Sequence, residues 1–164
     1  MNSYNQKILI VDDIEDNRFT LERRLSRTGY TSISQADCGK KALELVKKES
    51  FDLILLDLMM PDISGLDVLK ILKSDPKNRG IPVVMVTAAD EIETTAECIS
   101  HGAEDYITKP VNATLLKARV SACLEKKRFR DSEEHYLTKV EADKKRTQTF
   151  LKQILPEKIA EELN

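Results

Sequence analysis

The sequence is poor in several features that mark particular classes of protein. It has no tryptophan, and aromatic residues make up only 5% of its 164 residues, so a stacking surface for nucleic-acid bases is not expected. The net charge of −2 provides no broad attraction to nucleic acid. The apolar run at residues 8–11 is too short for a signal-peptide core or a membrane span. These absences predict a cytoplasmic protein that binds neither nucleic acid nor membrane.

Cysteine is also scarce. Cys38, Cys98 and Cys123 are far apart and do not have the spacing of metal ligands. We interpret them as free thiols in a reducing compartment. What the chain does contain is 41% hydrophobic and 33% charged residues, enough for a core with a well-solvated surface. Its length suits one domain of ordinary size with an extension.

Short apolar runs alternate with amphipathic segments as far as residue 125. The runs at residues 8–11, 53–56, 83–86 and 106–107 are typical of strands buried on both faces of a parallel sheet, and residues 31–34 are a weaker candidate. Apolar residues at helical spacing lie between them, and the last helix is predicted to begin near Asn112. The pattern predicts five β–α repeats, which make an α/β fold with helices on both faces of a parallel sheet.

Two helices have recognisable ends in the sequence. Gly29 is predicted to end the first helix, because glycine commonly follows a helix in the left-handed conformation. In "DEIETTAECISHG", Asp90 is the expected N-cap, with Glu93 as its capping-box partner. Gly102 is the expected stop of the same helix.

Polar side chains follow each of the four strong strand candidates. Asp12 and Asp13 follow the first, Asp57 follows the next, Thr87 ends the third and Lys109 comes just after the last. Each alone would be an ordinary turn, cap or solvated charge. Ligands of open parallel sheets bind beyond the carboxyl ends of the strands, so together these residues predict one site at that edge.

The chemistry of this set indicates phosphoryl transfer. Clustered carboxylates raise one another's pKa, and a divalent cation relieves their repulsion. Mg²⁺ prefers such oxygen ligands and keeps room for water and a phosphoryl group. Lys109 and the Thr87 hydroxyl suit phosphate oxygens. One aspartate is then expected to act as a nucleophile and form an acyl phosphate.

Four motifs carry a family resemblance. "ILIVDD", "LILLDLMMPDISGLDVL", "IPVVMVTA" and "AEDYITKP" resemble the receiver domain of two-component response regulators, over roughly residues 5–125. The resemblance implies a flavodoxin-like, doubly wound (βα)5 fold with a five-stranded parallel sheet, and we expect the receiver to occupy residues 1–125. It also implies a regulatory domain rather than an enzyme.

The same resemblance implies roles for the acidic residues. Asp57 is the expected phosphoacceptor. Asp12 and Asp13 are the expected Mg²⁺-binding pair, joined by Asp57 and by the backbone carbonyl of Met59. The loop after Asp57 contains Met60, which we interpret as core filler.

The remaining roles belong to the last two strands. By the resemblance, Lys109 contacts the phosphoryl group and the Lys109–Pro110 peptide is cis. Thr87 and Ala88 are expected to bind the phosphoryl oxygens. Thr87 and Tyr106 are the expected switch residues, which repack the face formed by the fourth helix, fifth strand and fifth helix.

Input and output follow from the resemblance. A histidine kinase or phosphotransfer protein is the expected phosphoryl donor. Alternatives for the output remain open: a stand-alone interaction module that acts by docking, or control of a phosphatase-type or transcriptional effector. No helix-turn-helix or basic patch is evident in the sequence.

The tail differs in composition. Residues 126–155 are polar, rich in both charge signs, and free of glycine and proline, which predicts a continuation of the last helix as a linker. Heptad spacing predicts a parallel dimeric coiled coil, against the simpler alternative of a solvated helix with incidental apolar residues. The expected seam consists of Leu137, Val140, Lys144, Thr147, Leu151 and Ile154.

The end of the sequence suggests a junction. Pro156 suits the first position of a new helix, so residues 156–164 are expected to begin a further helix or an output-domain junction. "ILPEKIAEELN" is similar to the segment that precedes the catalytic domain of class III adenylate/guanylate cyclases. We therefore expect a cyclase output domain to follow residue 164.

Overall fold

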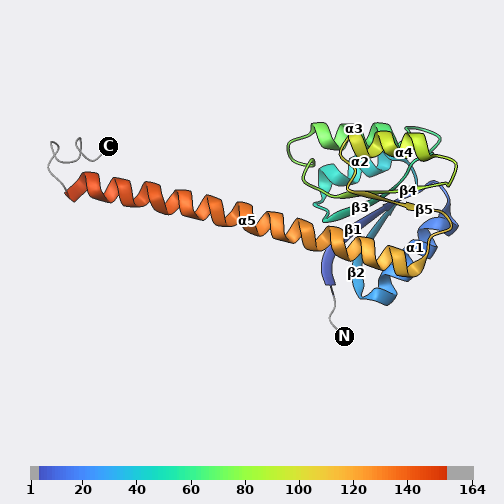
Figure 1. The fold of residues 1–164 in the computed structure, drawn as a ribbon, viewed down its shortest axis with the longest axis horizontal. Helices are drawn as coiled ribbons and strands as arrows, with labels where there is room; N and C mark the ends of the chain where they lie inside the picture. The colour runs from blue at the N-terminus through green and yellow to red at the C-terminus, as the bar shows by residue number, and fades with distance from the viewer. Residues whose placement is uncertain (1–3, 155–164) are drawn as a thin grey trace. The chain divides into compact units, whose positions relative to one another are not determined.

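The computed structural model describes residues 4–154, and the chain divides into two units between Lys127 and Arg128. The first unit contains a five-stranded parallel sheet in the order β2-β1-β3-β4-β5 (Figure 1). The strands are β1 Tyr4–Val11, β2 Tyr30–Ala36, β3 Leu53–Asp57, β4 Val83–Thr87 and β5 Asp105–Thr108. The helices are α1 Glu15–Thr28, α2 Gly39–Lys48, α3 Gly65–Ser74, α4 Ile92–Ser100 and α5 Ala113–Ile154.

The five predicted β–α repeats are confirmed, and the place of β2 in the sheet explains its weaker apolar signal. β3 and β4 lie inside the sheet and every residue of each is buried. β2 lies at an edge, and only its two end residues are buried. Because an edge strand meets solvent, its residues do not need to be apolar, and this is why residues 31–34 carried only a weak signal.

Two apolar cores lie on opposite faces of the sheet. Alternate residues of β1 point to opposite faces of the sheet. Leu9 and Val11 belong to the core under α2, α3 and α4. Ile8 and Ile10 belong to the core under α1 and the first turns of α5. This alternation is the period of two expected of a strand. Figure 1 shows α2, α3 and α4 together on one side of the sheet and α1 on the other.

The helix ends show one correction. Gly29 adopts φ 119°, as expected of a left-handed C-cap, and Gly102 adopts φ 105° just beyond α4. The capping box of Asp90 and Glu93 was wrong: Glu91 occupies the N-cap position of α4 and makes no side-chain bond to the helix. Its carboxylate accepts a hydrogen bond from the backbone N–H of Ala88 instead.

The second unit is helical as far as it is described. α5 continues through residues 128–154, and every side chain in that stretch is exposed. The predicted helical continuation is therefore confirmed to residue 154. Residue 155 and the junction expected at residues 156–164, including Pro156, lie outside the described residues. Between residues 4 and 154, no helix is both long enough and apolar enough to cross a membrane.

Candidate functional site

The sheet brings the predicted polar residues to one edge. β1, β3, β4 and β5 are consecutive neighbours and all parallel, so their carboxyl ends lie side by side. Asp12 follows β1, Asp57 and Thr87 end β3 and β4, and Lys109 follows β5. The topology thus gathers residues that are almost 100 positions apart in the sequence, since Asp12 and Lys109 share a hydrogen bond across 97 residues.

Three carboxylates form the centre of the site. One carboxylate oxygen from each of Asp12, Asp13 and Asp57 lies within 4.8 Å of the others. Asp12 is 1% exposed and Asp57 is 5% exposed, whereas Asp13 is exposed. Carboxylates are rarely buried without a partner, and here two are buried together beside a third. The cluster is therefore a concentration of negative charge that needs cations.

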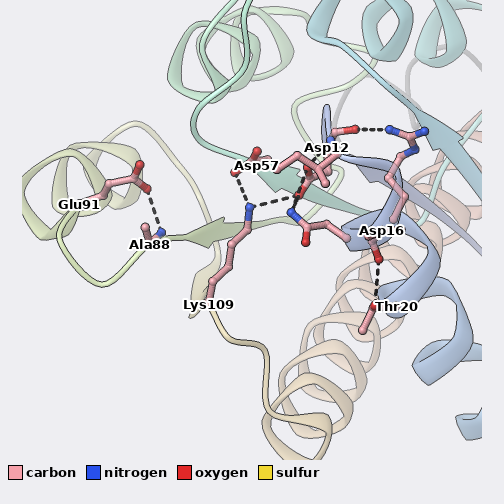
Figure 2. A network of polar contacts seen from close by, with 10 residues as sticks. Asp12, Asp16, Thr20, Asp57, Ala88, Glu91 and Lys109 are labelled. Carbon is pink, nitrogen blue, oxygen red and sulfur yellow. Dashed lines mark hydrogen bonds and ion pairs between the residues drawn. The ribbon is translucent and has the colours of Figure 1, made fainter.

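Lys109 supplies one such cation. Its Nζ lies 3.2 Å from Asp12 Oδ2 and 3.2 Å from Asp57 Oδ1, and so bridges two of the three carboxylates (Figure 2). Burial lowers the pKa of Lys109, but the charges of Asp57 and Asp12 outweigh burial and the net shift is upward. Lys109 therefore stays charged. The Lys109–Pro110 peptide at its base is cis, as expected.

One positive charge does not balance the cluster. Burial, followed by the negative charge of Asp12, raises the pKa of Asp57 from 3.8 to about 6, against the opposing effect of Lys109. A carboxylate with this pKa is easily ionised near neutral pH but is poorly stabilised by its surroundings. Asp57 is thus a buried carboxylate whose ionised form would be stabilised by a further positive charge.

The end of β4 forms another wall of the site. Thr87 is 1% exposed, and its carbonyl oxygen accepts a hydrogen bond from the backbone N–H of Lys109 at 2.7 Å. Ala88 follows it and is half-buried. The backbone N–H of Ala88 donates to Glu91 Oε2 at 2.9 Å, so this donor already has an anionic acceptor.

The loop after Asp57 is shaped by a close backbone approach. The N–H of Gly65 donates to the carbonyl of Leu58 at 2.8 Å, and a Cβ at Gly65 would lie only 2.2 Å from the backbone oxygen of Asp57. Only glycine fits this position. Met60 packs against the core, whereas the side chain of Met59 is 65% exposed. The interpretation of Met60 as core filler is confirmed.

Comparison with known proteins identifies this architecture. Residues 8–121 match the family model of the response regulator receiver domain. The chain belongs to this family. The receiver is 36% identical over 122 residues to "Chemotaxis protein CheY-3" of Vibrio cholerae, with 74% of this chain and 94% of that protein covered. The receiver therefore matches almost the whole length of this relative.

Longer relatives also contain this receiver. It is 40% identical over 124 residues to a Vibrio cholerae protein named "Probable cyclic di-GMP phosphodiesterase", with 76% of this chain and 28% of that protein covered. The chain spans about a quarter of the length of such curated relatives. A solved CheY-like receiver domain protein of Methanospirillum hungatei is 28% identical, with a TM-score of 0.71, and 77% of this chain and 99% of that one are covered.

Tyr106, the second expected switch residue, lies within β5. Its side chain is 41% exposed, and the guanidinium of Arg119 lies 5.8 Å from its ring centroid. Arg119 is itself held by Asp105 at 2.5 Å. Beside Tyr106 is a largely apolar cavity of about 340 Å³. Its lining consists of Thr87, Ala88, Ile92, Thr95, Ala96, Ile99, Tyr106 and Thr108.

The structure also reveals contacts that the sequence did not indicate. Asn17 Nδ2 donates to Asp12 Oδ2 at 3.2 Å, and Arg18 Nη1 donates to the Asp12 carbonyl at 2.8 Å. Both come from the first turns of α1 and hold Asp12 in place. In the sequence, only the position of Asn17 and Arg18 about one helical turn after Asp12 and Asp13 could have indicated this role.

Asp62 is another such residue. Its carboxylate accepts from the backbone N–H groups of Gly39 and Lys40 at 3.1 and 2.9 Å, and so caps α2 from a different loop. Hydrogen bonds from the backbone, that of Lys40 first, lower the pKa of Asp62 to about 2. The loop that carries Met59 is thereby tied to α2.

Proposed function

We propose that this receiver accepts a phosphoryl group on Asp57 and transmits the event through its last helix. The observation that carries the proposal is the state of Asp57: a buried carboxylate with a pKa of about 6, grouped with two more carboxylates and bonded to Lys109. A structural ion pair would gain nothing from the additional negative charges. Beside a nucleophile they can hold a divalent cation, which would offset both their own charge and that of the incoming anionic group.

The transfer forms one bond to phosphorus and breaks another. A carboxylate oxygen of Asp57 attacks phosphorus, the bond between phosphorus and the donor's imidazole nitrogen breaks, and the released imidazole takes up a proton. Lys109 neutralises charge on the transferring group from its place 3.2 Å from Asp57. Thr87 and Ala88, at the end of β4, supply a hydroxyl and a backbone N–H to phosphoryl oxygens.

The donor set fits Mg²⁺. Asp12, Asp13 and Asp57 offer oxygen ligands within 4.8 Å of one another, and the carbonyl of Met59 adds a neutral oxygen. The exposed side of the cluster at Asp13 leaves room for water. When bound, the cation would supply the positive charge that Lys109 alone does not provide.

A donor would approach beside α1. A cavity of about 200 Å³ borders Asp12 and Lys109 and is lined on the α1 side by Asn17, Thr20 and Arg24. We propose that a histidine kinase or phosphotransfer protein presents its phosphohistidine here, because an imidazole phosphate must reach Asp57 from the carboxyl edge of the sheet.

The response would pass through Thr87 and Tyr106. The cavity of about 340 Å³ beside them offers space into which the half-exposed Tyr106 ring can turn. Such a turn would change the surface made by α4, β5 and α5. It would also remove Tyr106 from the guanidinium of Arg119, which comes from α5.

The output would pass through the second unit. The seam of Leu137, Val140, Lys144, Thr147, Leu151 and Ile154 lies on a continuous helix with exposed side chains, which suits a parallel homodimer. We propose that the effector is a nucleotidyl cyclase, on the resemblance of residues 154–164 to the segment before such domains. The match to a relative whose name describes cyclic di-GMP hydrolysis supports an effector that acts on cyclic nucleotides.

A second candidate function has its own support. The receiver covers 94% of "Chemotaxis protein CheY-3", a relative that consists of little more than a receiver. A stand-alone module that acts by docking is therefore the alternative. Its output would be a partner protein rather than an attached domain.

One experiment tests the central proposal. Purified protein with Mg²⁺ and a small acyl phosphate donor is expected to gain the mass of one phosphoryl group, measured by intact mass spectrometry. Asp57→Asn is expected to abolish the gain, whereas Asp67→Asn, at an exposed carboxylate of α3 outside the cluster, is expected to keep it. Beryllofluoride with Mg²⁺ is expected to shift the NMR signals of Thr87 and Tyr106. Absence of both responses would refute the proposal.

A further inference from the structure

A contact at the end of β4 has a consequence for the proposed phosphoryl site. Residues 88–91 form a tight turn in which the N–H of Glu91 donates to the carbonyl of Ala88 at 3.1 Å. The carboxylate of Glu91 returns to the other side of the same residue and accepts from the N–H of Ala88 at 2.9 Å (Figure 2). Both polar groups of the Ala88 backbone are thus bound by Glu91.

We propose that Glu91 is a built-in competitor of the phosphoryl group, which keeps the β4–α4 loop in its unphosphorylated arrangement. This inference rests on the proposed function, in which the N–H of Ala88 binds a phosphoryl oxygen. A residue has a single backbone N–H, and a carboxylate acceptor makes that hydrogen bond a strong one. A phosphoryl oxygen gains this donor only when the Glu91 carboxylate leaves it.

Electrostatics act in the same direction. A phosphoryl group adds negative charge at Asp57, where three carboxylates already meet. A carboxylate that shares a donor with this group repels it, so the two acceptors do not occupy the site together. Phosphorylation therefore expels Glu91 rather than merely sharing Ala88 with it.

Glu91 also connects the site to α4. Its backbone carbonyl accepts from the N–H of Thr95 at 2.9 Å and from the hydroxyl of Thr95 at 2.7 Å, so it closes the first turn of that helix. α4 has no side-chain cap at its start. Once released, the Glu91 carboxylate lies at a helix N-terminus, where negative charge is favourable. Thr95 lines the cavity beside Tyr106.

These contacts describe a two-state loop. In one state Glu91 holds Ala88, and in the other the phosphoryl group holds Ala88 and Glu91 lies at the start of α4. A ligand shifts such an equilibrium by its difference in affinity for the two states. Glu91 is accordingly a positioning residue that lowers the apparent affinity of the receiver for a phosphoryl group.

The test compares Glu91 variants in the full chain with beryllofluoride as the probe. In saturating Mg²⁺, Glu91→Ala is expected to lower the Kd for beryllofluoride about tenfold, as loss of a charged acceptor implies. Glu91→Gln, which keeps a neutral acceptor, is expected to fall between this variant and the natural chain. The amide signal of Ala88 in the absence of beryllofluoride is expected to move upfield in Glu91→Ala.

Glu93→Ala is the matched control. Glu93 lies in the first turn of α4, is exposed, and carries the same charge without bonding Ala88. Its Kd for beryllofluoride is expected to stay within about twofold of the natural chain, and the Kd for Mg²⁺ alone is expected to match in both alanine variants. A Kd for Glu91→Ala equal to or above that of Glu93→Ala overturns the inference. If the natural chain binds no beryllofluoride, the proposed function itself fails.

Discussion

At the scale of single residues, the surroundings of Asp57 disfavour its ionised form. Burial and the neighbouring charge of Asp12 favour its protonated form, and Lys109 only partly offsets them. Between pH 3.8 and about 6 the folded chain therefore binds more protons at Asp57 than the unfolded chain does. The stability that Asp57 contributes is fully present below this window and is lost as the pH rises through it.

This loss of stability with rising pH can be measured in metal-free protein. The unfolding free energy of the natural chain, relative to that of Asp57→Asn, is expected to fall by on the order of 2 kcal/mol from the bottom to the top of that window. Asp57→Asn is therefore expected to be the more stable protein at neutral pH, as measured by urea denaturation with a chelator present. Added Mg²⁺ is expected to reverse the order. Parallel pH profiles for the two proteins would contradict the raised pKa.

Lys109 provides a second prediction, in which two ligands respond in opposite directions. Lys109→Met removes the positive charge between Asp12 and Asp57, so Mg²⁺ is expected to bind more tightly. Beryllofluoride is expected to bind at least about tenfold more weakly, because the lysine contact with the anion is lost. Isothermal titration measures both. Lys117→Met, an exposed lysine of α5, is the control and is expected to change neither affinity. Parallel changes for the two ligands would argue against a phosphoryl-binding lysine.

At the scale of elements, the junction of β3 and α3 depends on one glycine. A Cβ at Gly65 would meet the backbone oxygen of Asp57 at 2.2 Å and the Cα of Leu58 at 2.8 Å. Both neighbours are backbone atoms, which cannot move aside as a flexible side chain can. The loop after Asp57 and the start of α3 are therefore built around the absence of a side chain.

Gly65→Ala is accordingly expected to destabilise the receiver by about 2 kcal/mol or more, as overpacking against fixed backbone does. Gly80→Ala is the matched control, because a Cβ there meets nothing within 4 Å. It is expected to remain within about 0.5 kcal/mol of the natural chain. Chemical denaturation at one pH, with the chelator present, measures both. Equal denaturation midpoints for the two variants would show that the backbone around Gly65 relaxes to accept a Cβ.

Some features of these elements could be predicted from the sequence, and others could not. The strands and the polar residues at their ends were predictable, because buried parallel strands are continuous apolar runs and their carboxyl ends must meet. Asp62 and Glu91 were not. Asp62 caps α2 across more than 20 residues, and Glu91 turns away from its own helix to bond Ala88. A capping pattern predicts partners within the helix that follows, so it named Asp90 and Glu93. It indicates neither a cap from another loop nor a bond directed back toward the preceding strand.

At the scale of the whole molecule, the chain combines a receiver with a helical unit of different character. The receiver encloses two apolar cores, whereas every described residue from 128 to 154 is exposed. Large apolar side chains recur within that exposed helix, among them Leu137, Val140, Leu151 and Ile154. A lone helix of mixed charge has little tertiary packing to support it. A second copy of the chain, packed along this stripe, would provide that packing.

The exposed apolar stripe predicts a specific effect of substitution on assembly. Leu151→Asp places a charge in the proposed seam and is expected to convert a dimer into a monomer, because a buried unpaired carboxylate costs more than the contact provides. Ala142→Asp adds the same charge on the opposite face of the helix and is expected to leave the dimer intact. Sedimentation equilibrium of the three proteins at matched concentrations measures their masses. If the natural chain and Leu151→Asp have the same mass, the stripe is not the dimer seam.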